Sequence, residues 1–215
     1  MFLNLLSSIK LMVPSILISL AVALTLGTIL GMNGPFPAPG GATSGYYLDC
    51  GDVHLGLDLG CGTGLELEDY FALNPEAGVT GIDLCRPMLD ALEKKFPEKK
   101  LRLICASYFD EPIEKEHYDA AVSVESLHHF TKEAKIPLYA KLCRSLKPGG
   151  YFILTDYFAD HQEREDYFQR ELIRLKKEQG ISDNDFYHYD TPLTVANETD
   201  ALLQAGFAQV EVMNQ

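Results

Sequence analysis

One stretch of the chain decides its fold: Leu55-Gly56-Leu57-Asp58-Leu59-Gly60-Cys61-Gly62-Thr63-Gly64. Its first half is a short, mainly apolar run, which predicts a buried strand. The glycines that follow predict a turn with unusual backbone angles, in which a ligand can approach the main chain without meeting a Cβ atom. Apolar residues then recur at helical spacing from Leu65 to Phe71. The stretch therefore predicts a strand, a glycine turn and a helix whose free N–H groups face a ligand.

A second apolar run, Val79-Thr80-Gly81-Ile82-Asp83-Leu84, predicts a neighbouring strand that ends in a carboxylate. Asp83 lies 19 residues beyond Gly64, the separation at which the second strand of a doubly wound fold presents an acid to ribose hydroxyls. Taken alone, Asp83 would also suit a turn or a helix cap, but the preceding glycine turn favours a nucleoside site.

The glycine spacing and an acid within the first strand narrow the choice of nucleoside. Gly60, Gly62 and Gly64 are evenly spaced, which departs from the G-x-G-x-x-G pattern of dinucleotide sites. Asp58 lies two residues before the first glycine. Its negative charge there would repel a pyrophosphate and attract a ligand that carries an amine and a sulfonium. Residues 57–64 thus resemble the first motif of the class I S-adenosylmethionine-dependent methyltransferases, acid-x-Gly-x-Gly-x-Gly.

The resemblance extends over roughly residues 55–213. Its further segments are a third strand at 101–105, a fourth at 118–124, a loop with two histidines at 125–130, and a turn at 147–150 into a fifth strand at 151–155. It implies an α/β fold: a doubly wound, mostly parallel Rossmann-like sheet with helices on both faces. Residues 208–213 resemble the sixth strand, and the chain stops at Gln215. We therefore expect the sheet to lack the family's antiparallel seventh strand, with the C-terminal strand displaced or paired directly with the fifth.

The resemblance also implies S-adenosyl-L-methionine as the cofactor and assigns roles to its motifs. The expected cofactor-binding residues are Asp58, Gly60, Cys61, Gly62, Gly64, Asp83, Leu84, Ser107, Tyr108, Ser123, Val124 and Glu125. Asp58 would hold the methionine amine, directly or through water, and Asp83 the ribose hydroxyls. Leu84 would pack on the adenine, with Ser107 and Tyr108 at its edge; Ser107 stands where the family often has an acid. Ser123, Val124 and Glu125 would border the methionine arm.

The implied reaction is displacement of S-adenosylhomocysteine by an O, N, S or C atom of an acceptor. The sequence leaves the catalytic residue unassigned, and the candidates for a general base are His128, His129, Tyr157 and His188. Adjacent residues point in different directions, so we expect at most one of His128 and His129 to face the site. A structural role is the alternative for each histidine. The loop at 185–192 is expected either to shape the acceptor pocket or to pack beneath a helix at 160–179.

The composition restricts the acceptor and the compartment. Lys plus Arg is 18 and Asp plus Glu is 31, which gives a net charge of −13 and disfavours a nucleic-acid partner. A small-molecule acceptor is expected; the alternative is a degenerate or truncated cofactor-binding domain without turnover. The five cysteines form no C-x-x-C pair, which indicates reduced thiols in the cytoplasm and no metal site. Oligomeric state is left open.

The N-terminal third divides into two parts ahead of a methyltransferase domain at 52–215. Residues 11–32 are uncharged and long enough for a membrane-spanning helix within a hydrophobic segment 1–32. Three interpretations stay open: a membrane anchor, a buried helix that covers the domain, and a segment foreign to the functional protein. Ala21-Val22-Ala23 also has the small-x-small form of a signal-peptide cleavage site. Residues 33–51 predict a Pro/Gly linker.

Overall fold

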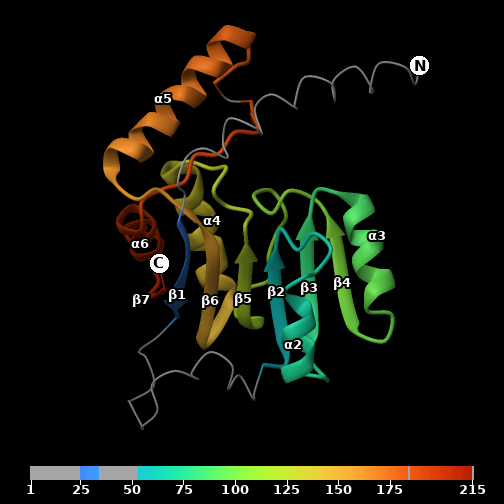
Figure 1. Ribbon diagram of the computed structural model, residues 1–215. Helices are drawn as coiled ribbons and strands as arrows, with labels where there is room; N and C mark the ends of the chain where they lie inside the picture. The colour runs from blue at the N-terminus through green and yellow to red at the C-terminus, as the bar shows by residue number, and fades with distance from the viewer. Residues whose placement is uncertain (1–24, 34–52, 184, 215) are drawn as a thin grey trace, which may run out of the picture.

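The computed structural model describes residues 25–33, 53–183 and 185–214, which form an α/β fold (Figure 1). Seven strands make one sheet in the order β4-β3-β2-β5-β6-β1-β7. Helices cover both faces, as the resemblance implied. The expected doubly wound, mostly parallel architecture is therefore confirmed.

Five strands run parallel and carry the predicted motifs. They are β2 (Leu55–Leu59), β3 (Gly78–Asp83), β4 (Lys100–Cys105), β5 (Tyr118–Val124) and β6 (Leu146–Phe158). Because they are parallel, their carboxyl ends share one edge, at the top of Figure 1. The glycine turn after β2, the acid at the end of β3 and the histidine loop after β5 therefore meet at this edge.

The helices pack on the two faces through separate apolar clusters. On one face, α2 (Leu67–Leu73) and α3 (Arg86–Lys95) bury Phe71 and Leu92 against β3. On the other face, α4 (Lys132–Ser145) and α6 (Val195–Gln204) cover the larger cluster. The fully buried side chains of that cluster include Ile29, Leu57, Leu127, Tyr139, Leu142, Phe152, Leu154 and Leu202.

Helix α5 (Gln162–Gln179) extends beyond the carboxyl edge of the sheet (Figure 1). It ends at Gly180, which adopts the left-handed conformation with φ of 65°. At its other end, the buried carboxylate of Glu165 accepts hydrogen bonds from the backbone N–H of Thr194 at 2.6 Å and from the side-chain amide of Asn197 at 2.8 Å. These contacts tie the start of α5 to the start of α6, and so fix the place where the segment returning from α5 reaches residue 194.

The N-terminal segment corrects two expectations. Residues Thr25–Met32 form β1, which lies antiparallel between β6 and β7 (Gln209–Asn214). We expected the sheet to lack an antiparallel strand at this position, and this expectation is wrong. The C-terminal strand does not pair directly with the fifth of the expected strands, because β1 lies between them. The strand that fills the gap comes from the opposite end of the chain.

The expected helix is also wrong over residues 25–32, for a physical reason. A strand in the interior of a sheet is apolar on both faces, so it has the same uncharged composition as a membrane-spanning helix. Ile29 is completely buried, and a Cβ on Gly31 would lie 2.8 Å from the ring of Phe207. The earlier part of the hydrophobic segment and residues 34–52, which hold nearly all of the expected linker, lie outside the described residues. Among the residues that are described, no helix has the length and apolar character needed to cross a membrane.

The role of β1 predicts that Ile29 contributes to global stability. We expect Ile29→Ala to lower the free energy of unfolding by about 2–5 kcal/mol and Ile29→Val by about 0.5–1.5 kcal/mol, because each leaves a cavity in the core. Leu203→Ala, at a half-exposed position on α6, is the control, with a smaller change expected. Urea unfolding followed by circular dichroism measures all three. Equal effects at positions 29 and 203 would contradict the placement of β1 in the sheet.

Candidate functional site

The glycine turn after β2 has the backbone conformation that its sequence predicts. Gly60, Gly62 and Gly64 all have positive φ, at 77°, 47° and 66°. A Cβ on Gly60 would collide with the side chain of Ser126, which follows β5. The N–H of Gly60 donates to the carbonyl of Ile82 at 2.8 Å, so the turn is attached to the end of β3. A side chain at Gly60 is therefore excluded both by the backbone angle and by the available space.

Asp83 lies directly against this turn. Its Oδ2 accepts a hydrogen bond from the N–H of Gly62 at 2.9 Å, and its Oδ1 accepts one from the N–H of Cys85 at 2.7 Å. The next residue, Leu84, is 71% exposed at the sheet edge. The structure thus brings together the glycine turn, the acid of the second motif and an exposed apolar side chain.

Asp58 is a buried carboxyl group beside the carboxyl of Glu66. It is 1% exposed, and neither of its oxygens has a hydrogen-bond partner among the described residues. Burial raises its pKa well above the usual value, and the neighbouring Glu66 carboxyl and, more weakly, Asp83 raise it further. Such a group is costly to bury unless a ligand satisfies it. A cationic group is the natural partner for this pair of carboxyls.

Three expected cofactor-binding residues have side chains committed to the protein itself. The hydroxyl of Ser123 donates to the carbonyl of Leu59 at 2.9 Å and joins β5 to β2. The thiol of Cys61 is buried beneath the turn, and burial raises its pKa. The hydroxyl of Tyr108 lies 3.1 Å from that of Ser126, and burial raises the pKa of Tyr108 to about 12. Of these three, only main-chain groups are left to contact a ligand directly.

The remaining expected residues lie at the carboxyl edge. Ser107 follows β4 and uses its hydroxyl to accept a hydrogen bond from the N–H of Phe109 at 3.2 Å. Val124 is half-buried at the end of β5, and Glu125 is exposed with a positive φ of 48°. The turn at Glu125 ends the strand and redirects the two histidines that follow.

A cavity of about 190 Å³ lies on the α2 face of the sheet. Asp58 and Glu66 lie at its wall, but most of its lining is apolar and comes from α2, β5 and β6. Its lining contains none of the three turn glycines and neither Asp83 nor the histidines. This cavity is therefore separate from the space above the carboxyl edge.

Above the end of β5, His128 is oriented by a buried carboxylate. Its Nδ1 lies 2.6 Å from Oδ1 of Asp156, which is 1% exposed at the end of β6. Asp156 also accepts hydrogen bonds from the N–H groups of Leu127 at 2.8 Å and Tyr157 at 2.9 Å. With Nδ1 as the donor to Asp156, Nε2 of His128 carries the free lone pair.

We name His128, His129 and Asp190 the His–His–Asp cluster. Asp190 Oδ1 lies 3.7 Å from His128 Nε2 and 3.1 Å from His129 Nδ1. The contact with His129 is the main reason that the pKa of Asp190 lies below its usual value. Both histidines thus approach the same carboxylate oxygen although they are adjacent in the chain. The reason is that they follow the Glu125 turn, where the alternation of a regular strand no longer applies.

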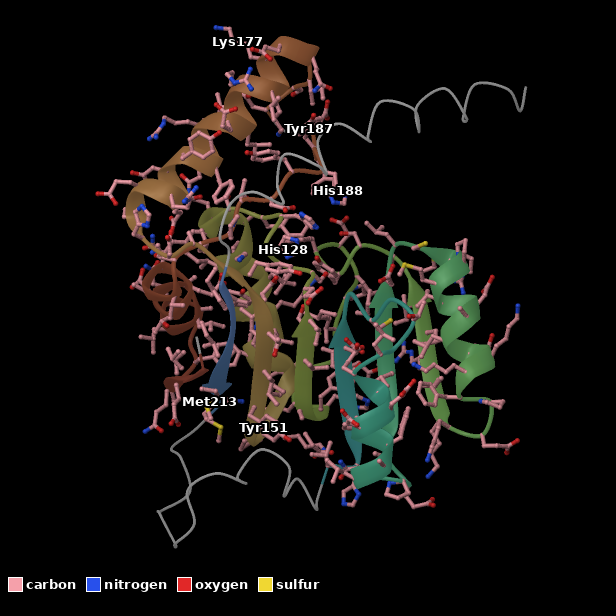
Figure 2. The ribbon with its side chains drawn as sticks, viewed as in Figure 1. His128, Tyr151, Lys177, Tyr187, His188 and Met213 are labelled. Carbon is pink, nitrogen blue, oxygen red and sulfur yellow. The ribbon has the colours of Figure 1, made fainter. Side chains whose placement is uncertain are left out.

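The other two candidate bases border this cluster. The rings of His129 and His188 are 4.3 Å apart, and the rings of His128 and Tyr157 are 5.1 Å apart. Burial, followed by the neighbouring His129, lowers the pKa of His188. Figure 2 shows His128 at the carboxyl edge and His188 above it, on the segment that returns from α5. The loop at 185–192 thus brings His188 and Asp190 to the histidines that follow β5, and its Tyr189 lies beside Phe168 of α5.

Sequence reasoning missed four residues of the site: Glu66, Ser126, Asp156 and Asp190. Asp156 had a usable signal, because it comes directly after the mainly apolar run 151–155, as Asp83 comes after the run 79–82. Asp190 lies 62 positions from His128 and had no local signal.

Comparison with known proteins decides the family. Residues 57–154, which run from β2 to β6, match the family described as a methyltransferase domain. Residues 57–154 form a class I S-adenosylmethionine-dependent methyltransferase domain. The turn glycines, Asp58 and Asp83 all lie within this methyltransferase domain.

Curated relatives of the methyltransferase domain are named for different methyl acceptors. The chain is 32% identical over 108 residues to a tRNA (carboxymethyluridine(34)-5-O)-methyltransferase of Arabidopsis thaliana, over 50% of this chain and 25% of that protein. It is 30% identical over 101 residues to a malonyl-[acyl-carrier protein] O-methyltransferase of Priestia megaterium, over 47% of this chain and 36% of that protein. The chain thus spans about a quarter to a third of these relatives, and the acceptor class stays open.

A solved structure supports the fold of the methyltransferase domain. The crystal structure of the YcgJ protein of Bacillus subtilis is similar with a TM-score of 0.56 and 19% sequence identity. The similarity covers 75% of this chain and 66% of that one. At this identity, the likeness concerns the fold alone.

The burial of Asp58 predicts that this carboxyl lowers the stability of the ligand-free protein. We expect Asp58→Asn to raise the free energy of unfolding of the ligand-free protein by about 1–3 kcal/mol at pH 7, because the unfolded chain ionises this carboxyl at that pH while burial in the folded protein opposes its ionisation. A carboxyl whose folded pKa is raised costs stability only above its unfolded pKa, so the gain should shrink as the pH falls toward 4. Urea unfolding at several pH values measures this. Asp90→Asn, at an exposed position on α3, is the control; a loss of stability in Asp58→Asn at neutral pH would contradict the assignment.

Proposed function

We propose that the protein transfers a methyl group from S-adenosylmethionine to a small-molecule acceptor held above the carboxyl edge of the sheet. The observation that carries the proposal is the glycine turn bonded to Asp83 with the unpartnered Asp58 beneath it. A nucleoside with a cationic amino acid arm matches the chemistry of these three features.

The residues present fit such a cofactor. Asp58 receives no hydrogen bond from the part of the chain that the structure describes, and the methionine ammonium would supply a donor together with a compensating charge. Each Asp83 oxygen already accepts one backbone hydrogen bond and keeps a second lone pair for a ribose hydroxyl. Leu84 offers an exposed apolar surface for the adenine, with the uncharged Ser107 at its edge. Main-chain atoms of the turn and of residues 123–125 would border the methionine arm.

When bound, the cofactor supplies an electrophilic methyl group on a sulfonium. The contribution of the chain is then mainly to hold the acceptor in line, since proximity and orientation account for much of the rate of such a transfer. The four candidate bases gather on the acceptor side of the edge, where neutral imidazole nitrogens can accept a proton from the attacking atom. Asp156 positions His128 for contact with an acceptor by fixing its tautomer.

The charge balance supports a small acceptor rather than a nucleic acid. A net charge of −13 opposes the approach of a polyanion. Labelled methyl transfer tests this directly, with a panel of small molecules in one set of assays and total tRNA in another. Transfer to a small molecule supports the proposal, and transfer to tRNA alone contradicts the acceptor class. Cofactor binding without any transfer would favour the alternative of a domain without turnover.

The contact between Asp83 and the glycine turn predicts a specific loss of affinity. We expect Asp83→Ala to weaken S-adenosylmethionine binding by about 1–3 kcal/mol, because a hydrogen-bonded carboxylate is removed from both the turn and the ligand. The control is Asp90→Ala, which removes an exposed carboxylate seven residues along the chain. Isothermal titration calorimetry measures both variants. Unchanged affinity in Asp83→Ala would contradict the ribose assignment.

The raised pKa of Asp58 predicts that binding the cofactor releases a proton. A cationic arm favours the ionised carboxylate, so a carboxyl that holds a proton in the free protein must lose it. We expect release of up to about one proton per ligand at neutral pH. Titrations in buffers of different ionisation enthalpy count these protons. The same count in wild type and Asp58→Asn would show that the proton comes from elsewhere.

A further inference from the structure

The His–His–Asp cluster has the composition and spacing of a metal site. One ligand atom each from His128, His129 and Asp190 lies within 4.8 Å of the other two. A metal with bonds of about 2.0–2.2 Å places neighbouring ligand atoms roughly 3–3.6 Å apart. The distances of 3.7 Å and 3.1 Å from Asp190 Oδ1 to His128 Nε2 and His129 Nδ1 are close to this spacing.

The orientation of His129 gives a second indication. Its Nδ1 is buried and lies 3.1 Å from Asp190 Oδ1, yet it makes no hydrogen bond there or with any other described residue. Buried polar atoms seldom lack a partner, so this nitrogen calls for one.

His128 has the outer partner that metal-binding histidines require. Its Nδ1 bonds to the buried Asp156, and this leaves the Nε2 lone pair directed toward Asp190. Histidine ligands almost always donate their second nitrogen to a carboxylate or a carbonyl in this way, which fixes the ring and its tautomer. Asp156 has its own oxygens held by two backbone N–H groups, so the arrangement is rigid.

The charge of the cluster also favours a cation. Asp156 and Asp190 bring two carboxylates to two imidazoles, and the ion pairs in the described part of the chain give neither carboxylate a lysine or arginine partner. Charges at least partly buried in this way are normally paired or coordinate a metal.

We propose that His128 Nε2, His129 and Asp190 bind one divalent transition-metal ion of the zinc, cobalt, iron or manganese type. Two imidazoles and a carboxylate suit these ions better than magnesium or calcium, which prefer oxygen ligands. Three protein ligands leave at least one coordination position for water or for another ligand. The site borders the acceptor space, but its affinity for metal does not rest on the proposed methyl transfer.

Cobalt binding tests the proposal without any cofactor or acceptor. The full chain, treated with a chelator and then freed of it, is titrated with Co²⁺ and followed by visible absorption and by calorimetry. We expect about one Co²⁺ per chain and displacement by Zn²⁺. His129→Ala and Asp190→Asn should each abolish or greatly weaken binding, and Asp156→Asn should weaken it about 10–100-fold through His128.

The matched control is His117→Ala, which removes a partly exposed histidine just before β5, at the opposite end of that strand from the cluster, and should leave Co²⁺ affinity unchanged. Circular dichroism shows whether each variant is folded. Because His129→Ala and Asp190→Asn are tested separately, the test still works if one of them fails to fold. No stoichiometric binding by wild type would overturn the proposal. So would wild-type affinity in both ligand variants, because the metal would then be held elsewhere, for example by cysteines. Failure of the protein to bind S-adenosylmethionine would leave this result unaffected.

Discussion

The hydrogen bond from the Gly62 N–H to the Asp83 carboxylate is the contact on which the rest of the site depends. It joins a turn that only glycines can form to the end of the adjacent parallel strand, and the bond from Gly60 to Ile82 reinforces it. With the turn held in this way, main-chain atoms form the wall of a ligand site. The Asp83 carboxylate thus has two roles, because it holds the glycine turn in place and would also bind the ribose hydroxyls.

The sheet that carries this turn is completed by a strand from the other end of the chain. β1 occupies the antiparallel position between β6 and β7, where we expected the sheet to lack a strand. Pairing in a sheet requires a strand of the right direction and composition, and it does not require a particular place in the chain. An uncharged stretch ahead of a methyltransferase domain can therefore belong to its core.

The sequence was sufficient to predict those parts of the fold and site whose signals lie within a short stretch of the chain. The β2 run, the three glycines and Asp83 lie within a short span, and each follows from strand periodicity or from the backbone freedom of glycine. Burial of Ser123, Cys61 and Tyr108 depends on which way each side chain turns, and the strand positions alone did not show this. β1 was mistaken for a helix because an uncharged run suits either element. Asp190 joins the histidines only through the path of the chain around α5, which no short-range pattern encodes.

The central claim is that the glycine turn and Asp83 bind S-adenosylmethionine, and a nuclear magnetic resonance titration tests it most directly. In the ¹⁵N-labelled full chain, we expect saturable shifts of the amides of Gly60, Gly62, Gly64 and Leu84, with smaller changes in the helices far from the edge. S-adenosylhomocysteine should shift the same amides. Amides that do not move at millimolar cofactor, or shifts confined to another part of the protein, would contradict the account.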